Sequence, residues 1–216
     1  MPKKSVFLVF EGGDGVGKTT QVTLLQEAIE ARWGPCVRTR EPGGSMYAEE
    51  IRNVILHSDY AGQANAFTMF ELFWAARTDH MGKTIMPALQ GGAHVICDRL
   101  DGTTWSHQIY GQDCPDLKEL FFLKRRMYLE EWGVCPDLYI FLDMDPEEAL
   151  RRVARRKNES TNHFDERELA FHKSVREGCH VFASMYPSVL IHADQDPHAV
   201  HTDIIRVLEN RKLFEE

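Results

Sequence analysis

Residues 12–19 have the types and the spacing of a loop that binds phosphate groups. The segment reads Gly12-Gly13-Asp14-Gly15-Val16-Gly17-Lys18-Thr19 and fits the pattern G-x-x-x-x-G-K-[ST]. Its glycines allow the backbone to curl so that successive N–H groups point at phosphate oxygens. Lys18 would bridge the β- and γ-phosphates of a nucleoside triphosphate, and the Thr19 hydroxyl would bind Mg²⁺. The expected phosphate-binding residues are Gly12, Gly13, Gly15, Val16, Gly17, Lys18, Thr19 and Thr20.

Two further polar clusters follow apolar, strand-like runs. Arg40 ends one such run and is followed by Glu41-Pro42-Gly43-Gly44, and Asp98-Arg99 ends another. Because ligands gather at the carboxyl ends of parallel strands, we expect both clusters to lie beside the phosphate loop. The planar guanidinium group of an arginine binds two phosphate oxygens at once, which suits an acceptor phosphate. Asp98 supplies a carboxylate for Mg²⁺ or for one of its waters.

A third cluster, Phe73-Trp74-Ala75-Ala76-Arg77, falls on a predicted helix. Phe73 and Arg77 are four positions apart and therefore share a helix face. A ring and a guanidinium group on one face can stack on a planar base and donate hydrogen bonds to its edge. Taken singly, Phe73 fits a core residue better than a ligand contact.

These chemical groups need a scaffold of alternating strands and helices, and the hydrophobic pattern predicts one. The short apolar runs predict parallel strands over Val6–Phe10, Cys36–Arg40, His94–Cys97, Leu138–Leu142 and Val189–His192. The longer patterns predict helices over Lys18–Arg32, Met46–His57, Ala64–Leu89, Leu117–Glu131, Pro146–Arg156, Glu166–Tyr186 and Pro197–Arg211. With 216 residues and no internal repeat or linker, the chain is expected to form a single α/β domain over residues 1–216.

The segment of residues 151–168 is dense in charge, and residues 157–162 offer almost nothing apolar to bury. One interpretation is a solvated surface excursion. The other is a basic lid that closes over an anionic substrate.

Composition and missing patterns exclude several classes of protein. A net charge of −8 argues against a general nucleic-acid binder, and no apolar stretch is long enough for a membrane span. The N-terminus does not read as a signal peptide, and the five scattered cysteines fit a reducing cytoplasm. The histidines show no compact metal-ligand spacing. The phosphate loop is shared by GTPases, motors and small-molecule kinases, but no Asn-Lys-x-Asp element for reading guanine is present.

The combination of patterns resembles the thymidylate kinase family of bacterial type, over nearly the whole chain. The resemblance rests on Phe10 to Gln21, Thr39 to Gly44, Ala75-Ala76-Arg77, Asp98-Arg99, Pro136 to Tyr139, Leu142-Asp143 and Ala193 to Pro197. It implies a P-loop nucleoside-monophosphate kinase fold with a five-stranded parallel sheet flanked by helices and a lid over residues 151–168. The implied reaction is transfer of the ATP γ-phosphoryl group to a deoxynucleoside 5′-monophosphate, in the first place dTMP to dTDP, with Mg²⁺. The family is usually dimeric, and the apolar helix with Met69, Phe70 and Trp74 offers either a dimer face or core.

The resemblance also implies roles for single residues. Arg99 would bind the acceptor phosphate, Phe73 would stack on the pyrimidine, and Arg77 would contact its O4 edge. Asp14 would position the acceptor and the metal, and Arg40 would lie near the acceptor phosphate. Further expected acceptor-site residues are Thr103, Thr104, His107 and Gln108, and Arg152 and Asp194 are expected on the ATP side, where residues 193–197 would border the adenine.

Gly15 decides where catalytic charge is expected. Family members with an arginine at this position use it at the transition state, whereas similar bacterial enzymes place that charge in the lid. Arg156 occupies the matching lid position, with Arg155 beside it as the alternative. Phosphoryl transfer depends on alignment and charge stabilisation, which a closing lid arginine can supply. The expected catalytic set is Lys18, Asp14, Arg99 and Arg156.

The sequence departs from the family pattern beside Gln108. Ser106 replaces a small apolar residue, and His107 stands where a tyrosine normally packs beside the sugar. In the lid, the usual Asp-Arg reads Asn162-His163. A smaller, more polar wall would admit dUMP or a 5-substituted dUMP such as 5-hydroxymethyl-dUMP, which stays open beside ordinary dTMP specificity. A nucleotide-binding regulator without transfer activity is the alternative from another class, although Arg99 speaks against it.

Overall fold

Five parallel strands form one sheet in the order β2-β3-β1-β4-β5. The structure is a computed structural model that describes residues 5–155 and 167–215. The strands are β1 (Phe7–Glu11), β2 (Cys36–Arg40), β3 (His94–Asp98), β4 (Leu138–Asp143) and β5 (Ser188–His192). Each predicted strand is confirmed to within one residue at either end.

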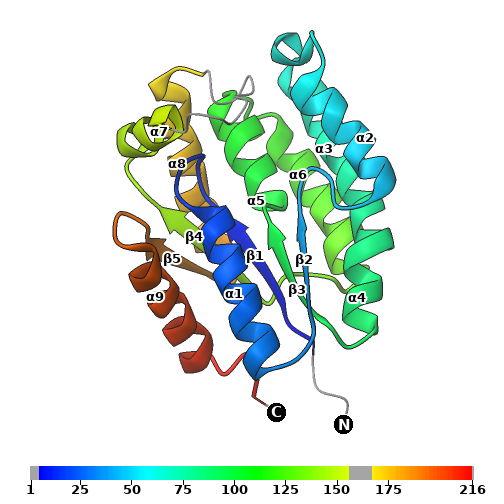
Figure 1. Cartoon of the computed structure of the whole chain (residues 1–216). Helices are drawn as coiled ribbons and strands as arrows, with labels where there is room; N and C mark the ends of the chain where they lie inside the picture. Colours follow the sequence, from blue (N-terminus) through cyan, green and yellow to red (C-terminus); the bar gives the residue numbers. More distant parts are fainter. Residues whose placement is uncertain (1–4, 156–166, 216) are drawn as a thin grey trace.

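Helices cover both faces of the sheet (Figure 1). The helices are α1 (Lys18–Arg32), α2 (Met46–His57), α3 (Ala66–His80), α4 (Met86–Gln90), α5 (Asp101–Thr104), α6 (Leu117–Arg125), α7 (Pro146–Arg155), α8 (Leu169–Met185) and α9 (Pro197–Asn210). A short 3-10 turn, η1 (Ala61–Gln63), and three π-helical segments, η2 (Met81–Ile85), η3 (Trp105–Gly111) and η4 (Arg126–Glu130), complete the regular structure of the described residues. None of the described helices is long and apolar enough to cross a membrane.

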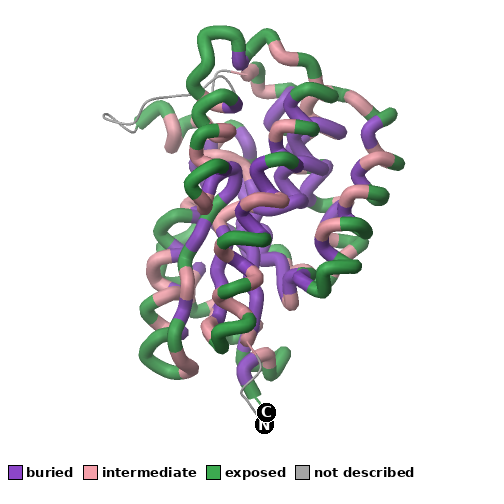
Figure 2. Tube along the Cα trace, turned by 90° about the vertical axis from the view of Figure 1, so that its right-hand side faces the viewer, coloured by how far each residue is buried: buried purple, intermediate pink, exposed green. Residues whose placement is uncertain are grey.

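The strict alternation of strand side chains separates two apolar cores. Phe7 and Val9 of β1 point into the core shared with α3, α6 and α8, whereas Leu8 and Phe10 point into the core beneath α1 and α9. Both cores run along the sheet as buried segments flanked by exposed helix surfaces (Figure 2). Burial on both faces explains why the strands are short and apolar throughout.

Several helical expectations were wrong in detail. The helix expected over Leu117–Glu131 changes to η4 after Arg125, and the one expected over Glu166–Tyr186 begins at Leu169. The expected helix Ala64–Leu89 begins instead at Ala66, because the Asn65 side chain accepts a hydrogen bond from the Thr68 N–H (2.8 Å), and it is interrupted by η2. Residues 101–111 were not expected to be helical, yet they form α5 and η3. A glycine and two threonines lower the helix propensity there, so packing against α8, where the rings of His107 and Phe171 meet at 5.9 Å, decides the conformation.

Candidate active site

The phosphate loop joins β1 to α1, as its sequence pattern predicts. Gly17 has a φ of 96° and ends the loop at the N-terminus of α1, where no side chain caps the first turn. The Lys18 ammonium group donates to the carbonyl oxygens of Gly12 (3.2 Å) and Gly13 (2.6 Å). Burial, followed by the nearby positive charge of Arg99, lowers the pKa of Lys18. A nucleotide phosphate placed here would meet the helix dipole and would compensate this excess of positive charge.

Gly15 packs directly against α7, the helix that leads into the expected lid. Its φ is +80°, and a Cβ atom there would lie 2.3 Å from the Ala149 carbonyl oxygen and 3.0 Å from the Val153 side chain. The backbone of α7 therefore leaves no place for a side chain on this residue. The structure thus gives a steric reason why a P-loop arginine is missing.

Arg99 connects the phosphate loop to the acceptor side of the site. It has a φ of 72°, and its guanidinium group donates to the Gly12 carbonyl (2.9 Å), the Thr103 hydroxyl (3.2 Å) and the Asp14 carboxylate (2.5 Å). Burial opposes the charged form, but Asp14 and Asp98 together raise the pKa of Arg99. In the same way, Arg99 and Lys18 overcome burial and lower the pKa of Asp14. Both shifts favour the charged forms of Arg99 and Asp14, which their expected catalytic roles require.

A pocket beside Arg99 collects most of the predicted acceptor-site residues. It is lined by Asp14, Arg40, Glu41, Pro42, Arg52, Leu56, Phe73, Asp98, Arg99, Thr103 and His107. Phe73, which fitted either core or ligand contact, is 4% exposed and does both. Arg40 is more exposed than expected and pairs with Glu49 (3.1 Å).

The sequence interpretation missed Arg52 and Leu56 of this pocket. Both lie on α2, and Arg52 donates to the Pro42 carbonyl oxygen at 2.6 Å. Burial, followed by the nearby charge of Arg40, lowers the pKa of Arg52. The only signal in the sequence was a basic residue on a helix that follows the Arg40 cluster.

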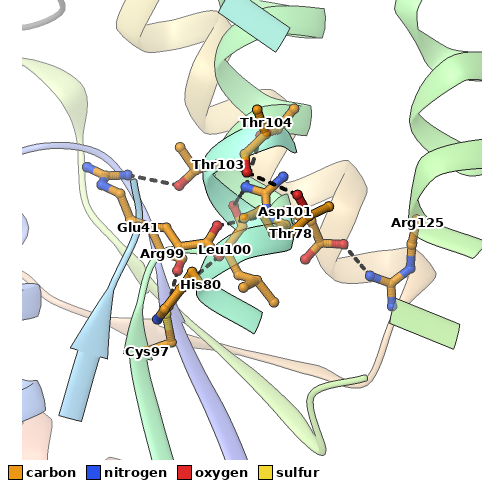
Figure 3. A network of polar contacts seen from close by, with 12 residues as sticks. Glu41, Thr78, His80, Cys97, Arg99, Leu100, Asp101, Thr103, Thr104 and Arg125 are labelled. Carbon is orange, nitrogen blue, oxygen red and sulfur yellow. Dashed lines mark hydrogen bonds and ion pairs between the residues drawn. The ribbon is translucent and has the colours of Figure 1, made fainter. Parts of the chain in front are cut away.

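Arg77 is not among the pocket-lining residues, because Glu41 holds it inside the protein. Its Nε donates to Glu41 (2.7 Å), and one terminal nitrogen donates to the Leu100 carbonyl (2.8 Å) and the Thr104 hydroxyl (3.1 Å). The same carboxylate meets the His80 ring at 3.0 Å, so Glu41 ties α3 to the loop after β2 (Figure 3). The other terminal nitrogen of Arg77 is buried and has no hydrogen-bond partner within the described part of the chain.

Gln108 and His107 occupy the first turns of the unexpected helix. Gln108 is fully buried, and neither of its amide atoms has a hydrogen-bond partner among residues 5–155 and 167–215. His107 lines the acceptor pocket, and its Nδ1 meets the Thr103 carbonyl oxygen at 3.1 Å. Burial and the charge of Arg99 lower the pKa of His107 to about 3, so the ring is neutral near pH 7. The Ser106 hydroxyl also meets Nδ1 at 3.0 Å, so two neighbours fix the orientation of the ring.

Two oxygen donors expected to bind Mg²⁺ meet in one pocket. Thr19 and Asp98 line it together, and the Oδ1 atom of Asp98 is buried with no hydrogen-bond partner in the described residues. A hydroxyl and an unpaired carboxylate oxygen beside the phosphate loop fit Mg²⁺ bound mainly by phosphates and water. Elsewhere in the described ranges, no group of three or more His, Cys, Asp or Glu residues is placed to hold a metal.

The residues expected on the ATP side contact each other at the start of the lid. Arg152 donates to Asp194 (3.0 Å) and approaches Glu148 (3.4 Å). Arg155 is exposed at the end of α7. Arg156, together with residues 157–166 of the expected lid, lies outside the described residues.

Nearby, Asp143 ends β4 and forms a cluster that the sequence interpretation did not single out. Arg176 contacts both of its carboxylate oxygens at 2.7 Å, and His180 contacts one of them at 2.9 Å. Although burial acts to raise it, these hydrogen bonds lower the pKa of Asp143. The cluster anchors α8 to the edge of the sheet that carries the phosphate loop.

A phosphate loop, a separate arginine-lined pocket beside it, and a parallel sheet flanked by helices define the class of P-loop nucleoside-monophosphate kinases. Comparison with known proteins gives the family. A model of the thymidylate kinase family matches residues 10–204. The chain is 36% identical to the thymidylate kinase of Pelotomaculum thermopropionicum over 208 residues, which cover 95% of this chain and 94% of that protein. It is also 36% identical to the thymidylate kinase of Gluconobacter oxydans over 212 residues, with 96% of each covered.

A solved structure agrees with these sequence matches. The crystal structure of thymidylate kinase from Ehrlichia chaffeensis superposes with a TM-score of 0.73 at 31% identity, covering 95% of this chain and 98% of that chain. The chain belongs to the thymidylate kinase family. The predicted family, fold and kinase class are confirmed.

Proposed function

We propose that this protein transfers the γ-phosphoryl group of ATP to the 5′-phosphate of dTMP, giving dTDP and ADP. The observation that carries the proposal is the place of Arg99, which contacts both the Gly12 carbonyl of the phosphate loop and Asp14 while lining the acceptor pocket. A cation held between donor and acceptor phosphates aligns them and offsets their repulsion. Family membership supports dTMP as the acceptor.

Unpaired polar atoms near the acceptor pocket support a pyrimidine with an oxygen at C4. Arg77 retains one buried N–H group without a partner, and Gln108 retains a buried donor and a buried acceptor, among the described residues. Buried polar groups of this kind are costly unless a ligand completes them. Thymine offers the O4 acceptor for Arg77 and the N3–H donor for Gln108, with the Phe73 ring as the stacking surface. Cytosine carries a donor at C4 and would leave Arg77 unpaired.

The catalytic charge is divided between the phosphate loop and the lid. Lys18 would bind the β- and γ-phosphates, and Thr19 and Asp98 would hold Mg²⁺, which neutralises charge on the phosphates. Since Gly15 has no room for a side chain, a lid arginine supplies the remaining cation, and we assign this role to Arg156 rather than Arg155. Arg152 and Asp194 would border the adenine and the phosphates of ATP.

We further propose a homodimer, formed by the outer face of α3 and α6. Met69, Phe70 and Trp74, the residues first considered for such a face, are at most 1% exposed and belong to the core. The large apolar side chains that remain exposed on this side are Phe67, Phe122, Leu123 and Met127. An ion pair between Lys124 and Glu71 (2.6 Å) shows that α3 and α6 present one continuous surface. Sedimentation analysis of the protein and of a Phe122→Asp, Leu123→Asp variant tests the assembly. The variant is expected to sediment as a monomer, and an unchanged dimer would refute this face.

An acceptor panel tests the reaction itself. ADP release with ATP and Mg²⁺ is measured for dTMP, dUMP, 5-hydroxymethyl-dUMP and dCMP, and we expect dTMP to have the highest kcat/KM and dCMP the lowest. A higher value for either deoxyuridine nucleotide would favour the alternative that Ser106 and His107 raise, since His107 lines the acceptor pocket and Ser106 contacts its ring. Nucleotide binding without acceptor-dependent ADP release would indicate a regulator. The cytoplasm, where these nucleotides occur, is the proposed location, in keeping with the free state of all five cysteines.

A further inference from the structure

Glu11, the last residue of β1, is a buried carboxylate for which the proposed reaction provides no role. It is 0% exposed. Its Oε1 atom accepts hydrogen bonds from the backbone N–H groups of Leu100 (2.9 Å) and Thr103 (3.0 Å). These N–H groups lie in the first turn of α5, whose own N-cap residue, Leu100, makes no side-chain cap. Glu11 therefore caps a helix that begins 90 residues later in the chain.

The close fit around this carboxylate explains a glycine within α5. A Cβ atom on Gly102 would lie 2.8 Å from Oε1 and 3.0 Å from the carboxyl carbon of Glu11. Any side chain on this residue would push the carboxylate away from the two N–H groups that it caps. Gly102 lowers the helix propensity of α5, but its lack of a side chain leaves the space that the Glu11 carboxylate occupies.

The second oxygen of Glu11 fixes the direction of a hydroxyl group. The Thr103 hydroxyl donates to Glu11 Oε2 at 2.7 Å. A hydroxyl has one hydrogen, so its lone pairs must serve every other partner. The remaining partner is the Arg99 guanidinium group, which donates to the same oxygen at 3.2 Å. Glu11 thereby keeps Thr103 an acceptor toward Arg99, and Figure 3 shows this contact between Arg99 and Thr103.

We propose that Glu11 is a positioning residue that holds Arg99 in place for the acceptor phosphate, acting through the Thr103 hydroxyl. The proposal rests on the proposed function, in which Arg99 binds the acceptor. Arg99 has two other anchors, the Gly12 carbonyl and Asp14, both on the phosphate loop. Thr103 is its anchor on α5. The two hydrogen bonds that link Glu11 with Thr103 and Thr103 with Arg99 therefore set the position of Arg99 relative to the pocket wall.

Glu11→Gln separates this role from the capping role. The side-chain amide oxygen of the glutamine continues to accept hydrogen bonds from the backbone N–H groups of Leu100 and Thr103. The opposite amide orientation is disfavoured because it would place the NH₂ group against these two N–H donors. The NH₂ group of the glutamine then takes the place of Oε2 and donates to the Thr103 hydroxyl. That hydroxyl can no longer donate to residue 11, so its hydrogen turns toward Arg99. The expected result at about pH 8 is a roughly tenfold rise in KM for dTMP, the size of one lost hydrogen bond to a charged group, with KM for ATP changed less than about twofold.

Thr103→Val and the double variant, which combines Glu11→Gln with Thr103→Val, complete a double-mutant cycle. Valine keeps the shape and removes the hydroxyl, so Thr103→Val is expected to raise KM for dTMP by a similar factor. In the double variant, no reversed hydrogen remains to oppose Arg99, so its KM for dTMP should not exceed that of Glu11→Gln. Effects that multiply, or equal rises of KM for both substrates, would overturn the proposal. If Glu11→Gln does not fold, the KM split of Thr103→Val decides between the same outcomes.

A matched control comes from Asp137, which accepts from the Phe7 N–H (2.8 Å) at the opposite end of β1. Asp137→Asn also exchanges a carboxylate for an amide that bonds a backbone N–H, and its kinetic constants should equal those of the wild type. The two proposals fail differently. A wild-type protein without dTMP-dependent ADP release sinks the proposed function. An active wild type, together with a Glu11→Gln variant whose KM for dTMP is unchanged, would refute only the role of Glu11.

Discussion

The two sides of the phosphate loop are built in opposite ways. On the acceptor side, Arg77 and Glu41 form an interlocked, buried pair, with side chains 0% and 2% exposed. On the lid side, the charged groups of α7 are open to water, with the Arg151 and Arg152 side chains 59% and 34% exposed. Both sides carry arginines paired with carboxylates, so the difference lies in burial and not in composition.

The difference in burial determines how easily the charged groups of each side change their partners. A buried hydrogen-bonded network is costly to disturb, so it holds its arginines in one orientation before substrate arrives. Exposed ion pairs contribute about 0–1 kcal/mol and are exchanged easily for a phosphate. The acceptor wall is therefore suited to recognising the base, whereas the exposed arginines of α7 can exchange a carboxylate partner for a phosphate.

The largest effect is expected when the acceptor wall loses its central charge. Arg99→Ala removes the acceptor contact and leaves the half-buried Asp14 without its partner. We expect kcat/KM for dTMP to fall by about 10³-fold or more, whereas ATP binding, followed by isothermal calorimetry, should weaken far less. A loss of less than tenfold would contradict the assignment of Arg99.

Removal of the lid charge should have a different kinetic signature. Arg156→Ala is expected to lower kcat about 10²- to 10³-fold with KM for dTMP nearly unchanged, because a charge that acts at the transition state does not hold the ground state. Arg155→Ala is the matched control from the neighbouring position and should keep most of its activity. If the two variants exchange these outcomes, Arg155 is the lid arginine.

The buried acceptor wall should also respond to pH. Burial raises the pKa of Glu11 from 4.5 to about 7, against the charge of Arg99 and together with that of Asp101. The folded protein therefore binds this proton more tightly than the unfolded chain does. The stability that this gives is complete below about pH 4.5 and is lost as the pH rises through about 7.

Glu11→Gln removes this dependence because its side chain stays neutral. We expect the free energies of unfolding of wild type and variant to diverge with rising pH, in favour of the variant, by up to about 3 kcal/mol between these limits. Urea unfolding at a series of pH values measures the difference. Parallel curves would show that Glu11 has an ordinary pKa.

The contact between the phosphate loop and the lid helix offers a smaller and purely steric test. Gly15→Ala introduces a Cβ atom against the Ala149 carbonyl at a positive φ, so we expect a loss of about 2 kcal/mol in unfolding free energy. Gly13→Ala is the control, since a Cβ there meets only a Val16 methyl group at 3.9 Å. Thermal unfolding compares the two, and an equal effect would show that α7 does not rest on Gly15.

Local patterns were sufficient wherever one short segment carries the information. Lys18 and Thr19 were predictable because the loop pattern and the preceding strand lie within a few residues of each other. The strands were predictable because burial on both faces leaves a continuous apolar run. Helix α5 with η3 was not predictable, since its sequence disfavours a helix and its stability comes from Glu11 and α8, which are distant in the chain.

The expected site residues divide in the same way. Asp14, Phe73, Asp98, Arg99, Thr103 and His107 meet as expected, because strand ends converge in a parallel sheet. Arg52 was missed, since a basic residue on an amphipathic helix is usually a solvated one. Arg77 stays a predicted contact to the base edge, but its spacing on the helix could not reveal that Glu41 holds its Nε in the interior.

The sequence by itself determined the phosphate loop, the order of the elements and the family, because each depends on residue types at short and fixed spacing. The tertiary structure decided which charged groups are buried and paired. Burial is a property of neighbours that the chain brings together from far apart, such as Glu11 with Thr103 and Glu41 with Arg77. Gly15 illustrates both contributions. The sequence revealed that an arginine is missing at this position, and only the packing of α7 supplied the steric reason.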